Sequence, residues 1–416
     1  MSSSDLAPVH GKIAVIGMGY IGLPTAVTFA QAGWDVVGVD VDPQRVKLIN
    51  SAVLPFVEEG FEALLKKAVE SGRFRATTTP ESADVCILSL PTPFLEDHSA
   101  DLRSIEAAVD SIIPALNGGE LIILESTVPP GTTQHVSQRV LQQRPDLSGQ
   151  LFFAHSPERV LPGRIVEEIT KNDRVVGGLT PEATQRAHDL YATFCTGEIA
   201  QTDAKTAELS KLVENSFRDV NIAFANEISL ICDRLGIDVW ELIELANHHP
   251  RVNILSPGPG VGGHCIAVDP WFIVSTAPDL AHLVRMAREV NDSKPRWVIE
   301  EVASAIEQAP PHAQVALLGL TFKADIDDLR GSPALDIAST LARSYPTVSF
   351  SVVEPHISKM PPSLSEYENV KLAALDDALD SCEIIVLLVG HEPFHHIDTG
   401  RIVKRVVIDT RGIWKL

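Results

Sequence analysis

Short apolar runs alternate with amphipathic segments over the first 200 residues of the chain. The runs have the length of strands, and the segments between them have the period of a helix. This alternation predicts a parallel sheet with helical crossovers, because parallel strands cannot be joined by a tight turn. The expected strands cover residues 12–16, 35–39, 85–90, 121–124 and 151–154.

A longer amphipathic stretch follows from Ala204 to about Gly236 and predicts one long helix, with Asp203 or Thr202 as its N-cap. Beyond residue 300 the short apolar runs return and predict a second sheet without a glycine motif. We expect strands at 314–320, 348–353, 383–389 and 406–408, and a helix at 332–343 capped by Ser332. The chain is therefore divided into residues 1–203, 204–300 and 301–416.

Composition narrows the class of protein. A chain of 416 residues is too long for a single hydrophobic core, which predicts more than one domain. The net charge of −21 argues against nucleic acid and anionic membranes as partners. Residues 1–11 lack the apolar segment of a signal peptide, and the apolar run 384–389 is too short to cross a bilayer. The five cysteines contain no CxxC pair, which favours a reducing compartment and argues against structural zinc. We expect a cytoplasmic protein.

A glycine motif joins the first expected strand to a helix-like segment, and Asp40 ends the next strand 18 residues after the last glycine. A lone G-x-G-x-x-G is a weak signal, but this context is that of a dinucleotide site. Asp40 would accept hydrogen bonds from ribose hydroxyls and repel a 2′-phosphate, so NAD is predicted rather than NADP. The expected cofactor residues here are Gly17, Gly19, Tyr20, Ile21, Gly22, Asp40 and Arg45.

Polar turns follow the later strands of the first sheet. Ligands of such sheets bind beyond the carboxyl ends of the strands, so Pro91, Thr92 and Thr127 are expected in the cofactor crevice. Thr127 alone could equally be a cap or turn residue. Glu158, after the strand at 151–154, is expected to point into the same crevice.

Two further groups carry possible chemistry. Lys211 and Asn215 stand one helical turn apart and would share a face suited to an oxyanion, although such a pair is often a solvated helix face. The loop at 257–264, rich in proline and glycine, delivers Cys265, with Asp269 four residues later. A helix start would favour the thiolate of Cys265 as a nucleophile, whereas the plainer alternative is a buried structural cysteine.

These elements together predict two Rossmann-like parallel-sheet domains joined by a central helical region with one long helix. The turns after the strands of the second sheet suit a second nucleotide. We expect the loop with Cys265 to lie in the cleft between the two domains. The long helix is also a candidate dimer interface, so a homodimer is predicted.

Several motifs occur together and in order along nearly the whole chain: GMGYIGLP, PTP, STVPPGTT, SPER, Lys211 with Asn215, GGHCIAVDP and FKADIDDLRGSP. Their set resembles the UDP-glucose/GDP-mannose dehydrogenase family. Within it, residues 249–254 followed by PGPGVGGHCIAVDPWF are similar to the branch that acts on UDP-N-acetyl-D-mannosamine.

The resemblance implies oxidation of the sugar C6 alcohol to a uronate by two NAD, for polysaccharide precursor synthesis. Cys265 would hold the aldehyde as a thiohemiacetal and then a thioester. Lys211 and Asn215 would hold the oxyanion, and Asp269 would position water or take a proton. Glu158 would act as acid and base in thioester hydrolysis, with Thr127 orienting the water. No metal is needed.

The resemblance also assigns residues to the UDP-sugar substrate, and Arg330 to the cofactor. The substrate residues are Glu158, Arg159, Val160, Lys211, Asn215, Arg218, Arg251, Asn253, Gly258, Gly260, Gly263 and Lys323. The UDP-glucose branch has a second glutamate where this chain has Pro162 and a lysine where it has Val268, so more of the base function falls on Glu158. Gly331 replaces a glutamate that relatives usually carry.

Alternatives remain open at this point. UDP-N-acetylglucosamine would be oxidised by the same chemistry, since no motif displays the configuration at C2. A 3-hydroxyacid dehydrogenase would pair a Rossmann domain with a Lys/Asn helix but would need neither Cys265 nor a second sheet. A catalytically inactive nucleotide-sugar-binding protein is the third alternative.

Overall fold

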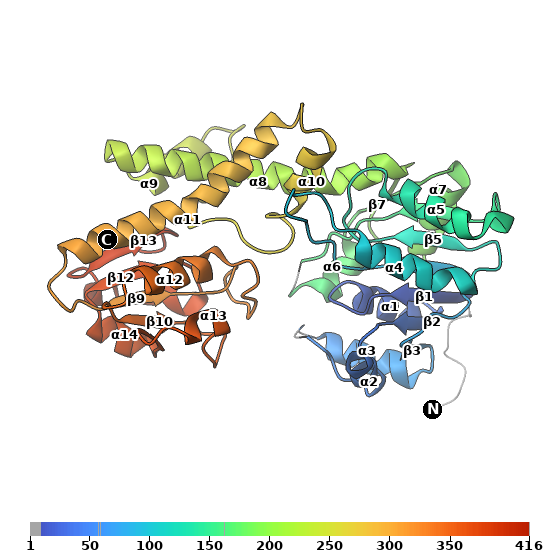
Figure 1. Ribbon diagram of the computed structural model, residues 1–416, viewed down its shortest axis with the longest axis horizontal. Helices are drawn as coiled ribbons and strands as arrows, with labels where there is room; N and C mark the ends of the chain where they lie inside the picture. The colour runs from blue at the N-terminus through green and yellow to red at the C-terminus, as the bar shows by residue number, and fades with distance from the viewer. Residues whose placement is uncertain (1–9, 57, 59, 162, 416) are drawn as a thin grey trace. The chain divides into compact units, whose positions relative to one another are not determined.

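The computed structural model of the chain describes residues 10–56, 58, 60–161 and 163–415. The chain divides into two compact units, Met1–Glu214 and Asn215–Leu416. Each unit contains one open sheet covered by helices on both faces (Figure 1). The predicted α/β class with two Rossmann-like sheets is confirmed.

The first unit is built on an eight-stranded sheet of order β3-β2-β1-β4-β5-β6-β7-β8. All neighbouring pairs are parallel except β6 with β7. The strands are β1 (Lys12–Ile16), β2 (Asp35–Val39), β3 (Phe74–Thr77), β4 (Val85–Leu88), β5 (Leu121–Leu124), β6 (Phe152–His155), β7 (Arg174–Gly178) and β8 (Ile199–Asp203).

Helices cover both faces of this sheet, and successive residues of a strand enter different cores. Ile13 and Val15 pack with α1, α3 and α7, whereas Ala14 and Ile16 pack with α4 and α5. This is why the strands are continuous apolar runs. The helices are α1 (Gly22–Gln31), α2 (Pro43–Asn50), α3 (Phe61–Glu70), α4 (Arg103–Ile112), α5 (Thr132–Gln143), α6 (Ile165–Lys171) and α7 (Pro181–Tyr191).

The five strands predicted in this unit are present within one or two residues of the expected bounds. Three strands, β3, β7 and β8, were not predicted. Their burial explains the miss: β3 and β8 are only partly buried, and β7 begins with the charged Arg174 and ends in two glycines. None of them therefore has the apolar run by which the others were found.

The second unit contains a parallel five-stranded sheet of order β11-β10-β9-β12-β13. Helices α11 and α12 cover one face, and α14 and α15 cover the other. The strands are β9 (Val315–Leu318), β10 (Phe350–Val353), β11 (Val370–Leu372), β12 (Ile384–Leu387) and β13 (Val406–Asp409). The shorter helices are α9 (Val239–Asn247), α10 (Asp269–Thr276), α12 (Pro333–Ser344), α13 (Pro362–Ser365), α14 (Leu375–Ser381) and α15 (Glu392–His395).

Two long helices are present where one was predicted. Helix α8 (Ala204–Leu235) begins as expected, because Asp203 accepts hydrogen bonds from the amide and hydroxyl of Thr206. Helix α11 (His282–Gln308) is 27 residues long and was missed, since Pro295 in its interior reads as a helix end. Buried Arg288 of α11 pairs with buried Asp219 of α8 at 2.6 Å and joins the two helices.

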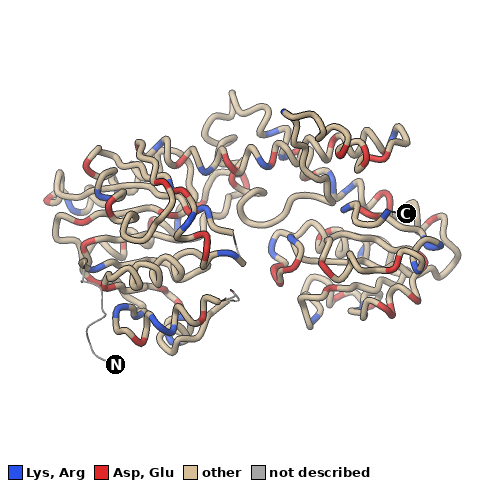
Figure 2. The backbone as a smooth tube through the Cα atoms, turned by 180° about the vertical axis from the view of Figure 1, so that it is seen from behind, with Lys and Arg blue, Asp and Glu red and all other residues tan. Residues whose placement is uncertain are grey.

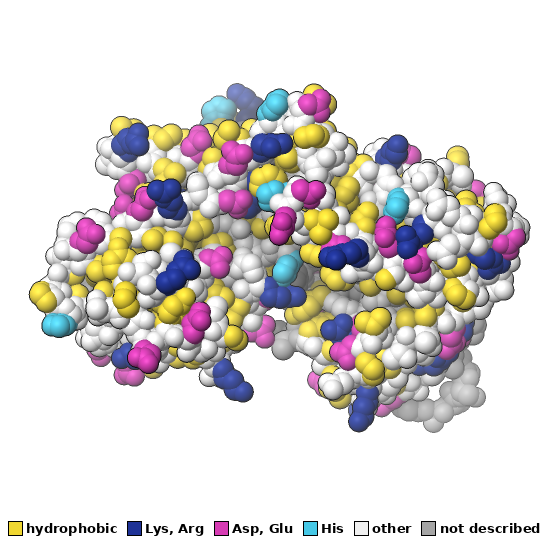
Figure 3. All heavy atoms as spheres, in the orientation of Figure 1, with side chains coloured by type: hydrophobic (Ala, Val, Ile, Leu, Met, Phe, Trp, Pro, Cys, Tyr) yellow, Lys and Arg dark blue, Asp and Glu magenta, His cyan; other side chains and the backbone are white. Residues whose placement is uncertain are grey.

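Charged residues of both signs are mixed along the backbone of each unit (Figure 2). Hydrophobic and charged side chains are likewise interspersed on the face seen in Figure 3. Within the described ranges, we find no helix with both the length and the apolar character needed to span a bilayer.

Candidate active site

The glycine motif forms a tight turn between β1 and α1. Gly17 has φ of +97°, and a Cβ there would lie 2.2 Å from the Ser89 carbonyl oxygen. A Cβ on Gly22 would lie 1.8 Å from the Gly17 oxygen, so helix and strand are packed in contact. A Cβ on Gly19 would meet nothing within 4 Å. The open backbone at Gly19, beside the start of α1, fits a pyrophosphate.

Asp40 is held at the end of β2 by contacts to the glycine turn. Its Oδ2 accepts from the Met18 amide and from Arg45 Nη1, both at 3.0 Å, and its Oδ1 accepts from the Asp42 amide. The carboxylate is thus fixed beside the motif, and Arg45 is bound to it. This arrangement fits the adenosine ribose of NAD.

The other predicted cofactor residues in this unit lie in the connections after β1, β4 and β5. Tyr20 stacks on Phe56 at 4.3 Å, and Ile21 is the N-cap residue of α1. The Thr92 hydroxyl donates to the Thr127 carbonyl at 2.7 Å, which ties the turn after β4 to the turn after β5. This bond uses only the backbone of Thr127; its side chain is half-buried, and its role in catalysis stays a prediction.

Glu158 is turned inward. Its Oε2 accepts from Arg174 Nη2 at 2.7 Å, and its Oε1 accepts from the amides of Arg159 and Val160 at 2.7 and 3.2 Å. The side chain is 7 % exposed and its carboxylate contacts Arg174, whereas the sequence predicted that it points into the cofactor crevice. Arg159 itself is paired with Glu214.

Helix α8 carries Lys211, Asn215 and Arg218. Lys211 and Asn215 are half-buried and one turn apart, whereas Arg218 is exposed. In the second unit, Asn215 Nδ2 donates to the carboxylate of buried Asp269 at 2.5 Å. The structure therefore brings together two of the residues to which the resemblance assigns catalysis.

Cys265 is exposed, which excludes the buried structural cysteine that the sequence left open. Its carbonyl accepts from the amide of Asp269 at 2.8 Å, so the two residues close one helical turn. Helix α10 itself begins at Asp269, one turn later than the helix start considered for Cys265. The pKa of the adjacent His264 is lowered by burial and by Arg330.

The glycines of the loop before Cys265 let its backbone pack closely within the second unit. A Cβ on Gly258 would lie 2.4 Å from Arg411 Nη1, and one on Gly260 would lie 2.9 Å from Pro333. Gly263 has φ of +86°, and its Cβ would lie 2.9 Å from Phe322. Two amides of the loop are already used, because that of Gly258 donates to Asn226 and that of Gly263 to the Gly331 carbonyl.

The remaining residues assigned to the substrate or the cofactor in this unit are exposed. Arg251 and Asn253 precede the glycine loop, in the connection after α9. Arg330 binds Asp328 through two of its guanidinium nitrogens, at 2.9 and 2.7 Å. Pro162, whose identity bears on the branch of the family, lies outside the described residues.

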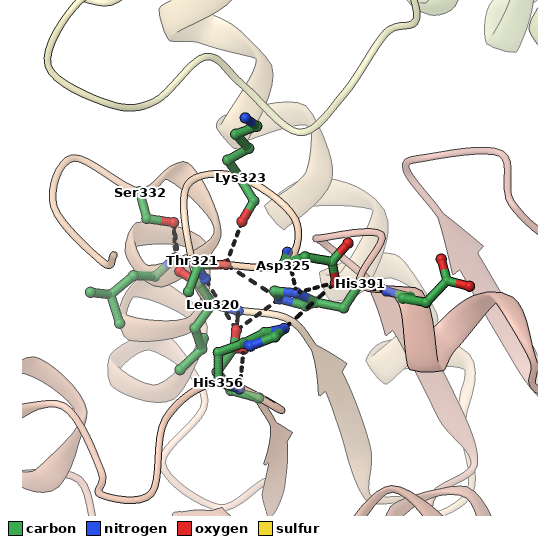
Figure 4. Close-up of polar contacts among 10 residues, drawn as sticks. Leu320, Thr321, Lys323, Asp325, Ser332, His356 and His391 are labelled. Carbon is green, nitrogen blue, oxygen red and sulfur yellow. Dashed lines mark hydrogen bonds and ion pairs between the residues drawn. The ribbon is translucent and has the colours of Figure 1, made fainter. Parts of the chain in front are cut away.

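Lys323 projects from the connection between β9 and α12, which is held by several hydrogen bonds. The Thr321 hydroxyl donates to the Lys323 carbonyl at 2.8 Å, and the Asp325 amide donates to His391 Nδ1 at 3.0 Å. Buried Glu354 accepts from His391 Nε2 at 3.1 Å and from the Leu320 amide at 2.7 Å. Figure 4 shows the Lys323 side chain leaving this cluster, with its ammonium directed away from the histidines.

The described part of the chain contains a group of possible metal ligands. Its members are Asp325, His356 and His391, whose potential ligand atoms all lie within 4.8 Å of one another. The lone pair of His391 Nδ1 is used by the Asp325 amide. A metal at this nitrogen would have to displace that amide. We therefore treat the group as a hydrogen-bonded support for the connection that carries Lys323.

Sequence reasoning missed several buried charged groups around the site. Arg174 and Glu125 lie beside Glu158, and Glu208 of α8 accepts from the amides of Gly131 and Thr133 at the start of α5. A charged residue at the end of an apolar strand was the available signal for Glu125. For the others no local signal exists, because their partners are distant in sequence.

Comparison with known families gives three consecutive matches. Residues 11–195 match the NAD binding domain of the UDP-glucose/GDP-mannose dehydrogenase family. Residues 205–293 match its central domain, and residues 316–416 match its UDP binding domain.

Individual relatives are similar over nearly the whole chain. An NDP-N-acetyl-D-galactosaminuronic acid dehydrogenase of Ralstonia solanacearum is 51% identical over 97% of this chain and 96% of its own length. A UDP-N-acetyl-D-mannosamine dehydrogenase of Salmonella typhi is 49% identical over 97% of this chain and 99% of its own. The solved UDP-D-ManNAc dehydrogenase of Pyrococcus horikoshii superposes with a TM-score of 0.88, at 38% identity, over 97% of this chain and 96% of that one.

Proposed function

The chain belongs to the UDP-glucose/GDP-mannose dehydrogenase family of NAD-dependent nucleotide-sugar dehydrogenases, and we propose that it oxidises UDP-N-acetyl-D-mannosamine to UDP-N-acetyl-D-mannosaminuronate. The observation that carries the reaction type is Cys265, exposed and one closed turn before a buried carboxylate. A simple 3-hydroxyacid dehydrogenase would need neither this thiol nor the UDP binding domain.

The galacto-configured sugar is the second candidate. The Ralstonia relative, at 51% identity, is named for N-acetyl-D-galactosaminuronic acid, and the Salmonella relative, at 49%, for the mannosamine sugar. Sequence identities this similar do not decide between the two sugars as the substrate of this chain. Both candidates are N-acetylated nucleotide sugars, and UDP-N-acetylglucosamine remains the third.

The glycine motif and Asp40 would hold NAD, which would supply the hydride acceptor, with two NAD used per sugar. The chain's own groups would then handle the carbonyl. The Cys265 thiolate attacks the aldehyde carbon to give a thiohemiacetal, and the second oxidation converts it to a thioester. Lys211 and Asn215 offer N–H groups to the oxyanion formed in the attack.

Water completes the reaction by hydrolysing the thioester. Glu158 takes a proton from the water, whose oxygen bonds to the acyl carbon while the sulfur of Cys265 leaves as thiolate. Asp269, held by Asn215, and Thr127 would orient this water. The product is a carboxylate at C6, for use in polysaccharide precursor synthesis.

Substrate binding is assigned to further residues of both units. Arg251 and Lys323 would provide positive charge for the diphosphate. Asn253, two residues after Arg251, and Arg218 of α8 are exposed and are assigned to the same substrate. Because the amides of residues 258 and 263 are already used, backbone donation is assigned to residues 260–262. Arg159, Val160 and Arg330 remain predictions from the resemblance.

The chain is further proposed to act as a homodimer through α8. Phe217, Phe224 and Ile231 are spaced by seven residues and are 71%, 51% and 45% exposed, and Leu235 continues the stripe at 64%. Such a stripe on a helix is suited to a second copy of the same helix. Location in the cytoplasm also stays a prediction.

The test is the number of NADH formed per sugar, measured in parallel with the UDP derivatives of N-acetylmannosamine, N-acetylgalactosamine, N-acetylglucosamine and glucose. We expect two NADH per sugar with the mannosamine derivative. Two NADH with another epimer would keep the mechanism and replace the substrate. Formation of one NADH would mean that the aldehyde escapes, and formation of none would favour an inactive binding protein.

Cys265→Ser provides the matched control. The serine hydroxyl is a weak nucleophile at neutral pH, so we expect uronate formation to fall by at least about 1,000-fold. Binding of NAD should be unchanged, because the glycine motif lies in the other unit. Full uronate formation by this variant would overturn the thioester mechanism.

A further inference from the structure

Two buried carboxylates share one buried arginine in the first unit. Arg174 Nη2 donates to Glu158 at 2.7 Å, and Arg174 Nη1 lies 3.9 Å from Glu125. The side chains of Glu125, Arg174 and Glu158 are 0%, 3% and 7% exposed. We call these three residues the buried trio.

The register of the only antiparallel pair in the described sheets creates this contact. Ala154 pairs with Gly178 and His155 with Gly177. Continued beyond the last paired residues, the same register sets Arg174 opposite Glu158. Glu125 immediately follows β5, the other neighbour of β6, so it arrives at the same place.

The charges of the buried trio do not cancel if both carboxylates are ionised. One guanidinium would then face two carboxylates, and the remaining negative charge would be buried. Uncompensated charge is costly in such surroundings, and the usual response is that one group binds a proton. Two carboxylates with one shared cation should therefore carry one proton between them.

Hydrogen bonds decide which carboxylate carries that proton. Glu158 accepts from the Arg174 guanidinium and from two backbone amides, none of which can reverse its role. Glu125 instead contacts the hydroxyls of Thr25 and Tyr191, each at 3.1 Å. A hydroxyl can donate or accept, so it tolerates a protonated Glu125.

Electrostatics agree with this assignment. Burial and the neighbouring Glu158 raise the pKa of Glu125 to about 7, although Arg174, Thr25 and Tyr191 act to lower it. Burial raises the pKa of the Tyr191 hydroxyl, and burial lowers the pKa of His155, beside β5, to about 3, so both are neutral. Neither Tyr191 nor His155 therefore adds a charge beside the buried trio.

We propose that Arg174 and Glu125 are positioning residues for Glu158: Arg174 fixes its carboxylate, and Glu125 carries the proton of the buried trio so that Glu158 stays ionised. The functional part rests on the proposed role of Glu158 in thioester hydrolysis. Neither residue touches the substrate in this scheme. Each acts through Glu158.

Infrared difference spectroscopy tests the proton without any substrate. Near pH 6 the protein should show the band of a buried, protonated carboxyl group, and Glu125→Gln should remove it. Glu182→Gln, which changes an exposed glutamate of α7, is the control and should leave the band in place. Absence of the band from the parent protein, or its persistence in Glu125→Gln, would overturn the assignment.

Thioester accumulation tests the role in the reaction. Acid-quenched Arg174→Met should carry the acyl group on Cys265, because loss of the donor should slow hydrolysis by about 100-fold while both oxidations proceed. Arg174→Lys should recover part of the rate. Glu125→Gln should lose the inflection near neutral pH that the titration of Glu125 gives the hydrolysis profile.

The infrared and thioester experiments distinguish a failure of the positioning role from a failure of the proposed function. If no sugar is oxidised, the infrared arm still decides the protonation of the buried trio. If sugars are oxidised but Arg174→Met hydrolyses the thioester at the parent rate, the positioning role is wrong. Binding of NAD to each variant checks that the first unit is folded.

Discussion

Asp40 shows how one carboxylate can serve both fold and selectivity. It accepts from the Met18 amide inside the glycine turn and also binds Arg45. As long as the carboxylate is present, it repels a 2′-phosphate and occupies the guanidinium that could bind one. Arg45 could therefore bind a 2′-phosphate if the carboxylate of Asp40 were removed.

Replacement of Asp40 by asparagine should free Arg45 to bind the 2′-phosphate of NADP. The amide oxygen still accepts from Met18, but the charge that holds Arg45 is gone, so NADP should gain about tenfold in affinity relative to NAD. Titration calorimetry with both cofactors measures the ratio. The double variant with Arg45→Met should lose the gain, and an unchanged ratio in Asp40→Asn would contradict the argument.

Residues such as Asp40 could be found from sequence because their partners are close in the chain. The strand, the glycines and the acid are all contained in residues 12–40. Arg174 could not be found in this way, since its contact with Glu158 depends on the register of β6 and β7. The inward direction of Glu158 followed from the same contact and was missed with it.

At the scale of elements, hydrogen bonds from side chains define the conformation of the connection between β9 and α12. Asp325 adopts φ of +60°, an unusual value for a residue with a side chain. Its amide binds His391, and its carboxylate accepts from the Glu392 amide at 2.9 Å. These bonds hold Lys323 in place from the adjoining backbone.

Two substitutions of His391 should distinguish the contribution of Nδ1 from that of Nε2. Asparagine can keep an acceptor near Nδ1 for the Asp325 amide, whereas glutamine can keep only a donor near Nε2 for Glu354. If the support acts through Lys323, His391→Gln should raise KM for the sugar about tenfold and His391→Asn much less. Steady-state kinetics with saturating NAD measures both.

Lys323→Ala gives the control for that comparison. In its background the two His391 variants should have equal KM values, since the group that they position is absent. Additive effects would mean that His391 stabilises the sheet without positioning Lys323. The affinity for NAD should not change in any of these variants.

Elements were predicted from sequence where burial was uniform. Strand β5 is apolar throughout, and β1 and β2 are apolar after a charged first residue; all three were found with their full bounds. Helix α11 was missed, because Pro295 interrupts its pattern and its buried face includes Arg288, Asn291 and Lys294. Those polar residues are tolerated because they bond to α8, a fact that no local window contains.

At the scale of the whole molecule, the homodimer proposed for the exposed stripe on α8 can be tested by substitution. Phe217→Glu with Phe224→Glu would place two charges in the proposed interface. We expect analytical ultracentrifugation to show a dimer of the parent chain and a folded monomer of this variant. Leu280→Glu, at a leucine that is 77% exposed outside α8, is the control and should stay dimeric. A parent chain that sediments as a monomer would contradict the proposal.

The two sheets were predictable at this scale because most of their central strands bury both faces, and such strands can be recognised without knowledge of their partners. The family followed from motifs spread over nearly the whole chain. The choice among N-acetylated sugars could not follow, since it depends on the shape around a single carbon atom of the ligand.

Unequal exposure of the cysteines has a practical consequence. Cys86, Cys232 and Cys382 are buried and Cys195 is half-buried, whereas Cys265 is exposed. A mild alkylating reagent should therefore count competent chains in a preparation, one label for each. For the same reason we expect peroxide to inhibit the proposed reaction selectively, since a single sulfenic acid would form at the thiol proposed to carry the acyl group.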